Sequence, residues 1–527
     1  MLRTSVGPAG LAAIALLVPS NAPRAQETAD PMQSITEAEL RDHIHYLASD
    51  FLAGRDAGSE GYTLAAHYGA ILFGAAGLEP MLADSAGAFT FFQRIAFKNM
   101  KVSGASALRV TVDGETQNYR LGEGFLAVQL FSSRPLNTEE TPVFVGRGIE
   151  EPDHGWNDYE GLEVSGKIAV MVGGAPTRDA EPVLPEEQHA VYSSLQRSAN
   201  MRVMSALRHD PSALIIVVDS GSISLWNEVA TMMERPSMRS DSPAGAEEGA
   251  PRASPWIIFM KAEDAAGLLS GTGCDPQTGG GTCTPGPLDG VRVALDLKQD
   301  VEPAFSSPNV VALLPGTDPA LKDEHIVVTA HLDHVGIRNG QIYNGADDNA
   351  SGSAAILEAA EAAAMAPVKR SIIFVLFTAE EDGLLGAMHF VANPPVPVES
   401  IVLNINLDMV GRNSPDWPES LLAMGSENRR PQLLELIRDV NSRVGAELDW
   451  RLNEGSDPHN HVQRSDQLAF MQKGIPAILI TRGFMGPDYH RPSDDPGTIN
   501  YAKVLQATRL AYGLAAEAAN REPLFEE

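Results

Sequence analysis

Residues 325–336 read HIVVTAHLDHVG, and this stretch decides the fold. It begins as an apolar run typical of a buried strand and stops at a cluster of histidine and aspartate. Four more apolar runs share this character and are bracketed by segments of helical periodicity, which predicts an α/β fold with a mainly parallel, mixed sheet between helices. The five strand-like runs are NVVALL (309–314), HIVVTA (325–330), SIIFVLFT (371–378), IVLNINLD (401–408) and PAILIT (476–481).

Helical segments lie between and around these runs. Thr36 and Glu39 form a capping-box pattern that predicts the start of the first helix, and a second helical pattern covers about 62–73. Later segments repeat apolar residues at helical spacing over 351–365, 384–391, 431–444 and 501–519.

Acidic and imidazole side chains follow the strands at one edge of the predicted sheet. Ligands bind at the carboxyl ends of the strands in sheets of this kind. Carboxylates gathered in one crevice repel each other, and burying one without a partner costs several kcal/mol, so the pattern predicts a divalent cation. The side chains are His331 and Asp333 in AHLDHVG, Asp347 and Asp348 in GADDNASG, Glu380 and Glu381 in TAEEDG, Asp408 in NLDM and His490 in DYHR.

The donor types narrow the choice of metal. The chain has two cysteines, Cys274 and Cys283, so a four-cysteine zinc site is excluded. Imidazole and carboxylate suit zinc, and they are also compatible with manganese or cobalt. One carboxylate can bridge two ions about 3.5–4 Å apart, and a hydroxide between such ions is a nucleophile near neutral pH. The pattern therefore favours a hydrolase.

The charge of the chain excludes other classes of protein. Its 527 residues include 39 Lys and Arg against 69 Asp and Glu, which gives a formal net charge of −30. Because an acidic chain gains nothing from counterion release on phosphates, we expect binding neither to nucleic acid nor to an anionic membrane surface.

The first residues, 1–25, are predicted to be a secretory signal peptide. Arg3 precedes the short apolar run LAAIALLV (11–18), and small residues follow, with cleavage expected after Ala22 or Ala25. The run is shorter than the roughly 20 residues of a membrane span, and no later segment is long and apolar enough. The protein is therefore predicted to be secreted or periplasmic.

From Thr141 onward the residue pattern changes to that of a separate β-rich module. Short apolar runs such as VFVGRGI (143–149) alternate with turn residues. Residues 234–255 contain almost no large apolar side chains and are predicted to be a mobile loop. Export makes a disulfide between Cys274 and Cys283 possible, with two free thiols as the alternative.

The order of these motifs resembles a known family. His-x-Asp, Gly-Ala-Asp-Asp-Asn-Ala-Ser-Gly, Glu-Glu, Asn-Leu-Asp-Met and Tyr-His look like the co-catalytic zinc exopeptidases, which include bacterial leucyl aminopeptidases and glutamate carboxypeptidases. The resemblance is strong over about 305–520, and HYLASDFLAGRDAGSEG (45–61) is similar to the opening segment of the family's catalytic domain. It implies a zinc-exopeptidase, phosphorylase/hydrolase-like catalytic domain formed by 33–134 and 301–527. Residues 135–300 are similar to a protease-associated (PA) domain inserted into it.

The resemblance implies two zinc ions that share a carboxylate. The bridging position falls on Asp348 because it directly precedes Asn349, and the adjacent Asp347 is the rival. The implied ligands are His331 and Asp408 for one ion, Glu381 and His490 for the other, and Asp348 for both.

Two further residues receive roles from the same resemblance. Glu380 would be the general base that takes a proton from the attacking water and delivers it to the leaving amine. Asp333 would accept the second N–H of His331 and fix its tautomer.

Nearby polar residues are expected to play other parts. His334 is expected to be a neighbour of Asp333 rather than a ligand, and Ser465 lies in no Gly-x-Ser-x-Gly nucleophile elbow. We interpret His459 and His461 as a polar rim, Asp494 and Asp495 as partners of His490 or helix caps, and Phe484 and Met485 as core or as lining of a side-chain pocket.

The sequence thus predicts an exported two-zinc exopeptidase acting on peptides, most consistent with an aminopeptidase because an acidic rim favours a free ammonium group. A carboxypeptidase or dipeptidase of the same family is the first alternative. It would need a cation for the terminal carboxylate, and Arg412, Arg482 and Arg491 lie near the motifs. A binding protein with a non-catalytic zinc site is the second alternative, and the oligomeric state is left open.

Overall fold

The computed structural model describes residues 30–129, 134–178, 181–233, 236–240, 254–413, 420–454, 461–483 and 486–525. The predicted signal peptide (1–25) and most of the loop predicted at 234–255 lie outside the described residues. Within the described ranges, the helices are all too short or too polar to cross a bilayer.

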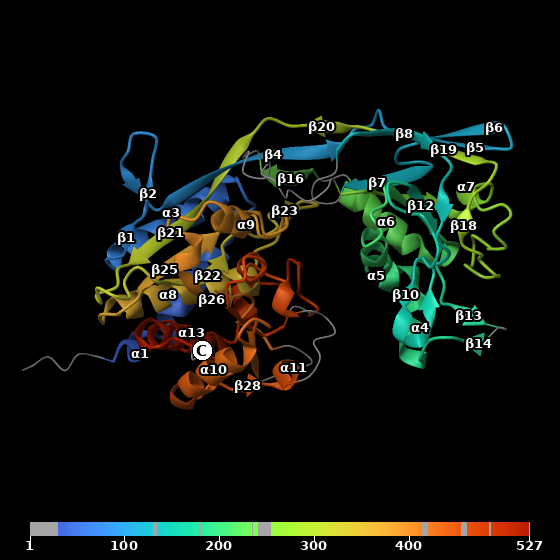
Figure 1. Cartoon of the computed structure of the whole chain (residues 1–527). Coiled ribbons are helices and arrows are strands. Elements are labelled where there is room, and N and C mark those ends of the chain that lie inside the picture. Colours follow the sequence, from blue (N-terminus) through green and yellow to red (C-terminus); the bar gives the residue numbers. More distant parts are fainter. Residues whose placement is uncertain are drawn as a thin grey trace, which may run out of the picture.

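A large mixed sheet forms the core of one lobe (Figure 1). Its central strands β25, β22, β26 and β29 pair in parallel, whereas β21 pairs antiparallel with both its neighbours, β25 and β4. The loop 315–324 after β21 is too short for a parallel crossover. The α/β prediction is confirmed, with antiparallel strands flanking a parallel centre. In spatial order the strands are β16 (Ser237–Ser240), β4 (Phe92–Val102), β21 (Phe305–Leu314), β25 (Ser371–Phe377), β22 (His325–His331), β26 (Ile401–Leu407), β29 (Ala477–Thr481), β27 (Leu421–Gly425) and β28 (Leu448–Asp449), with β1 (Glu79–Pro80) and β20 (Gln299–Val301) paired to β21 and β4.

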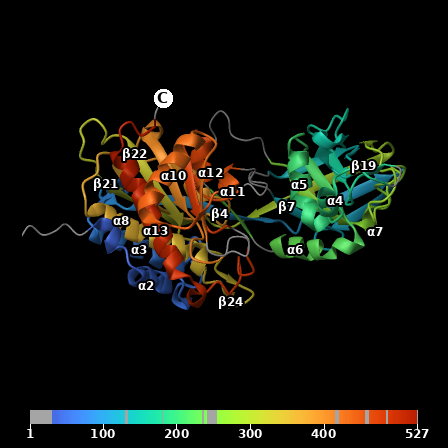
Figure 2. The same cartoon turned by 90° about the horizontal axis from the view of Figure 1, so that it is seen from below.

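Helices cover both faces of this sheet because successive strand residues point to opposite sides. In β25, Phe374 belongs to the apolar core on one face and Phe377 to the core on the other. At the start of the first long helix, the Thr36 hydroxyl accepts a hydrogen bond from the Glu39 amide, as the capping pattern predicts. The first face packs against α2 (Glu37–Leu47), α3 (Glu60–Ala75), α8 (Gly352–Ala364), α10 (Arg430–Val444) and α13 (Tyr501–Asn520), and the second against α9 (Leu385–Ala392) and α12 (Gln467–Gln472). Figure 2 shows α2, α3, α8 and α13 together on one side of this lobe.

Apart from β16, which pairs with β4, the described residues between β4 and β20 build a second lobe, which we call the inserted lobe (Figure 1). A six-stranded and a four-stranded sheet enclose one apolar core, and helices cover the outer face of the larger sheet. The strands are β18 (Gly286–Pro287), β9 (Val143–Phe144), β12 (Ile168–Met171), β15 (Ala213–Val218), β17 (Trp256–Lys261) and β7 (Phe125–Gln129) in one sheet and β6 (Glu115–Arg120), β5 (Ala107–Val112), β19 (Val291–Leu297) and β8 (Leu136–Glu140) in the other, with helices α5 (Leu195–Leu207) and α6 (Ile223–Met233).

The inserted lobe includes strands that precede residue 135, the position at which the sequence analysis places its start. Strand β5 pairs with β19, and β7 pairs with β17. The local pattern at 107–129 shows strands but not their distant partners. The boundaries 135 and 300 and the PA-like character of the lobe remain predictions. The remaining short elements are α1 (Pro31–Ser34), α4 (Glu186–Tyr192), α7 (Ala262–Ala265), α11 (Arg451–Glu454) and the hairpins β2–β3 (Leu82–Ala83, Phe89–Thr90), β10–β11 (Glu150–Glu151, Trp156–Asn157), β13–β14 (Thr177–Arg178, Glu181–Pro182) and β23–β24 (Ile337–Arg338, Gln341–Ile342).

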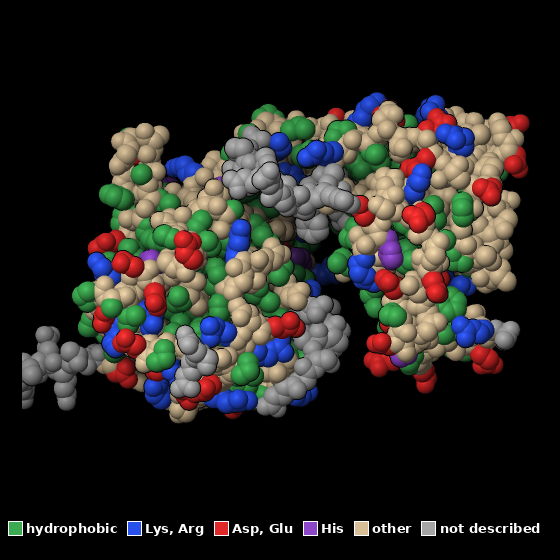
Figure 3. All heavy atoms as spheres, in the orientation of Figure 1, with side chains coloured by type: hydrophobic (Ala, Val, Ile, Leu, Met, Phe, Trp, Pro, Cys, Tyr) green, Lys and Arg blue, Asp and Glu red, His purple; other side chains and the backbone are tan. Residues whose placement is uncertain are grey.

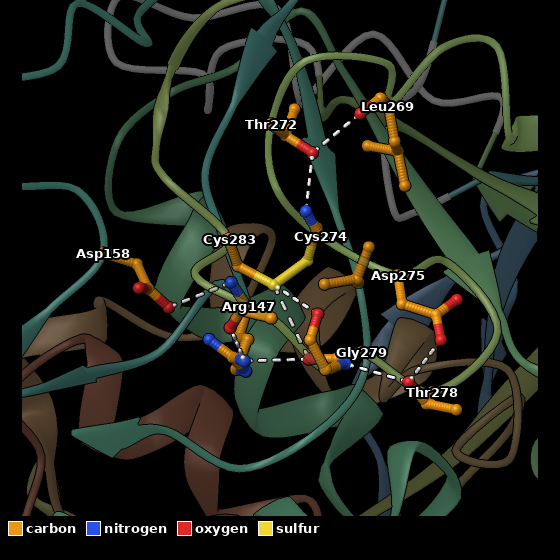
Figure 4. Close-up of a disulfide and its surroundings, with 12 residues drawn as sticks. Arg147, Asp158, Leu269, Thr272, Cys274, Asp275, Thr278, Gly279 and Cys283 are labelled. Carbon is orange, nitrogen blue, oxygen red and sulfur yellow. Dashed lines mark hydrogen bonds between the residues drawn. A yellow bond between two sulfur atoms is a disulfide. The ribbon is translucent and has the colours of Figure 1, made fainter. Parts of the chain in front are cut away.

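The two cysteines form a disulfide in the inserted lobe (Figure 4). The bond between Cys274 and Cys283 closes a glycine-rich loop, and Cys283 is buried against the lobe's core. Arg147 donates from Nη2 to the carbonyl of Gly279 at 2.8 Å, which ties the loop to the segment that follows β9. Of the two alternatives left by the sequence, the structure therefore has the bonded one.

Replacing both cysteines by serine should destabilise the inserted lobe. A disulfide that closes a loop of this length restricts the unfolded chain and contributes about 2–3 kcal/mol. Thermal unfolding of Cys274→Ser/Cys283→Ser should begin at a lower temperature than that of the parent protein, and a reducing agent should lower only the parent's transition. Equal transitions for both proteins under oxidising conditions would contradict this expectation.

Candidate metal centre

Two groups of possible ligand atoms converge where the parallel strands end. In each group the donor atoms lie within 4.8 Å of one another. His331 ends β22, and the donors Glu380 and Glu381 follow β25. The first group contains His331, Glu380 and Asp408, and the second contains His334, Asp348, Glu381 and His490.

Spacing within the first group suits a tetrahedral zinc ion. Ligand atoms at bond lengths of about 2.0–2.1 Å from such an ion lie about 3.3–3.4 Å apart. His331 Nε2 is 3.3 Å from Asp408 Oδ1 and 3.4 Å from Asp348 Oδ1. Glu380 Oε2 is further away, at 4.0 Å from His331 Nε2. By these distances His331, Asp408 and Asp348 are ligand candidates, whereas the carboxylate of Glu380 lies beside them.

In the second group, three side chains face a common point. His490 Nε2 lies 2.9 Å from Glu381 Oε2 and 3.2 Å from Asp348 Oδ2. Despite these short distances, the nitrogen has no hydrogen-bond partner among the described residues. Because the atoms are close but not aligned as donor and acceptor, the arrangement fits coordination of a shared cation better than a hydrogen bond.

Asp348 connects the two groups. Its Oδ1 faces His331 and its Oδ2 faces His490, so one carboxylate presents one oxygen to each group. Burial alone would raise the pKa of Asp348, but the neighbouring imidazoles hold it well below its usual value. The peptide bond between Asp348 and Asn349 is cis.

Asp347, the rival for the bridging position, points elsewhere. Its Oδ2 accepts a hydrogen bond from Arg482 Nε at 2.8 Å, and its Oδ1 accepts one from the backbone N–H of Gly411 at 2.6 Å. Both Asp347 and Arg482 are almost completely buried. The pair therefore holds the loop that carries Asp348 against the end of β29, and Asp347 is engaged in this contact rather than in the donor groups.

Replacing Arg482 by methionine should destabilise the protein strongly. The variant leaves the buried carboxylate of Asp347 without its cation, which typically costs about 3–5 kcal/mol. Chemical denaturation of Arg482→Met should show this loss, and the double variant Arg482→Met/Asp347→Asn should recover part of it because it removes the unpaired charge. If the single variant unfolds at the parent's denaturant concentration, the ion pair does not hold the loop.

Asp333 lies behind the metal centre, and its contacts differ in detail from the prediction. His331 Nδ1 is 3.1 Å from the backbone carbonyl of Asp333 but 4.0 Å from the carboxylate. A carbonyl can only accept, so Nδ1 carries the proton and Nε2 is free to bind a metal. The carboxylate instead accepts the backbone N–H groups of Glu380 and Glu381, at 3.1 and 3.3 Å. Asp333 thus fixes two strand ends relative to each other.

The electrostatics of the centre separate the two adjacent glutamates. Burial raises the pKa of Glu380 well above its usual value, and the neighbouring carboxylate of Asp408 raises it further. The pKa of Glu381 falls to about 2 despite burial, because His334 and His490 face it. Adjacent carboxylates with opposite shifts are suited to different tasks, proton transfer for one and cation binding for the other.

Asp494 and Arg55 hold loops around the centre in place, a role that the sequence analysis did not assign to them. Asp494 accepts the backbone N–H groups of Asp347 and Asp348 at 3.0–3.1 Å, so it orients the loop that carries Asp348 rather than His490. Arg55 is fully buried and donates to the carbonyls of Leu332 and Gly345. Arg55 lies in the LAGRDAG segment. The charged residue flanked by small ones was the sequence feature that could have indicated its buried, supporting role.

The other candidates lie apart from the donor groups. Ser465 is buried and accepts a hydrogen bond from Asn406. His461 is buried outside both groups formed by the described residues. His459, Phe484 and Met485 lie outside the described residues.

Comparison with known proteins gives a family match for the segment that contains the metal-centre candidates. Residues 309–515 match the model of peptidase family M28. This segment belongs to peptidase family M28. The expected resemblance to co-catalytic zinc exopeptidases is therefore confirmed, and the M28 segment contains every predicted ligand from His331 to His490.

Relatives and solved structures agree with this assignment. The chain is 30% identical over 205 residues to aminopeptidase YwaD of Bacillus subtilis, covering 37% of this chain and 42% of that protein. It is 28% identical over 246 residues to a probable leucine aminopeptidase of Trichophyton verrucosum, covering 44% and 62%. The chain thus spans about half the length of these relatives. An aminopeptidase structure from Aneurinibacillus sp. strain AM-1 has the same fold over 95% of this chain and 98% of its own, with a TM-score of 0.54 and 18% identity.

Proposed function

We propose that the protein is a zinc-dependent aminopeptidase that removes N-terminal residues from peptides. The observation that carries this proposal is the convergence of two donor groups that share Asp348, with Glu380 beside them at 4.0 Å from His331. The relatives' printed names, aminopeptidase and leucine aminopeptidase, support it.

The chain's own residues can perform each proton transfer of peptide hydrolysis. Bound zinc supplies Lewis acidity at the scissile carbonyl and lowers the pKa of water. Glu380 is buried beside the donors and outside the ligand spacing, so it can take a proton from the attacking water and pass it to the leaving amine. Asp333 holds Glu380 in place through its backbone N–H.

The charged side chains near the centre favour recognition of a substrate's amino terminus over recognition of its carboxyl terminus. Arg482 is paired with Asp347, and Arg412 with Asp488 and Asp494. Two of the three arginines that could hold a terminal carboxylate are therefore committed to carboxylates of the chain. Arg491 is exposed and leaves the carboxypeptidase alternative testable.

Substrates with free or blocked termini test the assignment. We expect hydrolysis of aminoacyl 4-nitroanilides and none of their N-acetylated forms. Cleavage confined to N-blocked dipeptides with a free carboxylate would reverse the choice, and zinc binding without hydrolysis of either class would favour the binding-protein alternative. Export remains part of the proposal and is supported by the apolar run at 11–18 and by the disulfide.

We infer that the inserted lobe limits the size of the substrate. Figure 3 shows a hollow between the two lobes. A cavity of about 260 Å³ is lined by residues of both lobes, among them Met232, Met233 and Gln129 of the inserted lobe and Glu381 and Asp382 beside the metal centre. A peptide that extends from the centre would therefore contact the inserted lobe, whereas an aminoacyl anilide is short enough to avoid it.

Enlarging Met232 should reduce the cleavage of long substrates selectively. Its side chain is 56% exposed and lines the cavity, so Met232→Trp should lower kcat/KM for a pentapeptide by about 10-fold or more through steric exclusion, with little change for an aminoacyl anilide. Met204→Trp is the matched control, because Met204 is 52% exposed on α5 of the same lobe and does not line this cavity. Equal losses for both substrates would refute size selection at this wall.

A further inference from the structure

A buried histidine belongs to the second donor group without being one of the five expected ligands. His334 Nδ1 lies 2.7 Å from Glu381 Oε1 and 3.8 Å from Asp348 Oδ2, and its side chain is completely buried. The sequence interpretation as a neighbour of Asp333 gave it no contact with the centre. The structure makes it the hydrogen-bond partner of a metal-ligand candidate.

Distances distinguish His334 from the ligands themselves. Two ligand atoms of one tetrahedral zinc ion lie about 3.3–3.4 Å apart. The pairs that join His331 to Asp408, His490 to Asp348 and His490 to Glu381 measure 3.3, 3.2 and 2.9 Å. The contact between His334 and Glu381 is shorter, at 2.7 Å, and has the alignment of a hydrogen bond. Glu381 thus uses Oε1 for His334 and keeps Oε2 for the point that it shares with His490.

The fold makes room for this imidazole and holds its plane. Gly345 has φ +57°, and a Cβ atom there would come within 2.5 Å of His334 Cγ and Cδ2. On another side, the ring packs edge-on against His490, with centroids 5.6 Å apart. The backbone N–H of His334 donates to the carbonyl of Arg55 at 3.2 Å. One ring therefore contacts two ligand candidates of the second group.

We propose that His334 is a positioning residue for one of the two zinc ions. Its Nδ1–H donates to Glu381 Oε1, so Glu381 would present its other oxygen, Oε2, to the ion. His331 and Asp408 receive no such contact from His334, so the effect is confined to the ion held by Glu381 and His490. This inference rests on the proposed two-zinc function and adds a residue that sets the affinity of one site.

Zinc titration of the metal-free full chain tests the proposal. Isothermal titration calorimetry on the parent protein should resolve two binding steps. His334→Leu removes the donor at similar volume, and we expect the Kd of one step to rise by about 10–100-fold while the other stays unchanged. His334→Asn places an amide N–H near the position of Nδ1 and should restore the affected step. His334→Gln, whose amide reaches the position of Nε2 instead, should not, and it decides the matter if the leucine variant does not fold.

The outcomes separate this inference from the proposed function. A parent protein that binds no zinc would overturn the function itself. Two unchanged steps in the folded His334→Leu or His334→Gln variant would overturn the positioning role alone. If asparagine fails to restore the step, and the visible spectrum of the cobalt-loaded parent shows one more nitrogen ligand than that of the variant, His334 is a ligand and the hydrogen-bond account is wrong.

Discussion

Glu380→Gln should lower kcat by at least about 10²–10⁴-fold while the protein keeps its metal. A general base contributes roughly this factor, and glutamine cannot accept a proton. The side chain lies 4.0 Å from His331 Nε2, further than the ligand candidates, so its replacement should leave the donor groups intact. Steady-state kinetics on an aminoacyl anilide, with metal content measured by mass spectrometry on the same sample, give both numbers.

A matched variant controls for handling and expression. Glu399→Gln changes an exposed glutamate after α9 and should behave as the parent protein in both measurements. Turnover within a few-fold of the parent in Glu380→Gln would remove Glu380 from the mechanism. Loss of zinc from that variant would instead show that Glu380 acts as a ligand.

Removing the metal should abolish activity and weaken the fold. Without cations, the buried carboxylates of Asp348, Glu381 and Asp408 face one another, and burial raises the pKa of Asp408. An ion that binds the folded state alone stabilises it by about 4 kcal/mol when its free concentration is 1,000 times Kd. We expect calorimetry after chelation to show a lower transition temperature, and added zinc to restore both activity and the transition.

Two observations would contradict this expectation. One is activity that persists after the metal content has fallen below one ion per hundred chains. The other is loss of activity with a chelator that has been saturated with zinc beforehand, because that result would reflect the chelator rather than metal removal.

The sequence predicted those parts of the fold that local pattern determines. The apolar runs that became β22, β25 and β26 are continuous because both faces of the sheet are covered, and each ends at a polar cluster. The carboxyl ends of parallel strands share an edge, so convergence of the donors followed from strand order. The roles assigned to the individual donors remain predictions.

Contacts between residues that are distant in the sequence could not be predicted from the local sequence pattern. The choice between Asp347 and Asp348 depends on Arg482, which lies 135 residues from Asp347, and nothing in the sequence shows which carboxylate it meets. The expectation that the Asp333 carboxylate holds His331 was incomplete for the same reason, because the partners of that carboxylate follow a different strand. Strands β5–β7 likewise show their period but not their pairing.

The contacts of Arg55 determine which parts of the chain can fold first during its synthesis. Its guanidinium joins carbonyls that lie 277 and 290 residues later, beyond the whole inserted lobe. At a synthesis rate of about 5–20 residues per second, a ribosome needs on the order of 15–60 s to deliver the second of these partners. The inserted lobe can fold within that interval, whereas the N-terminal helices must wait with their apolar surfaces uncovered. Chaperone protection of the nascent N-terminal segment is therefore expected to matter more for this chain than for a relative without the insertion.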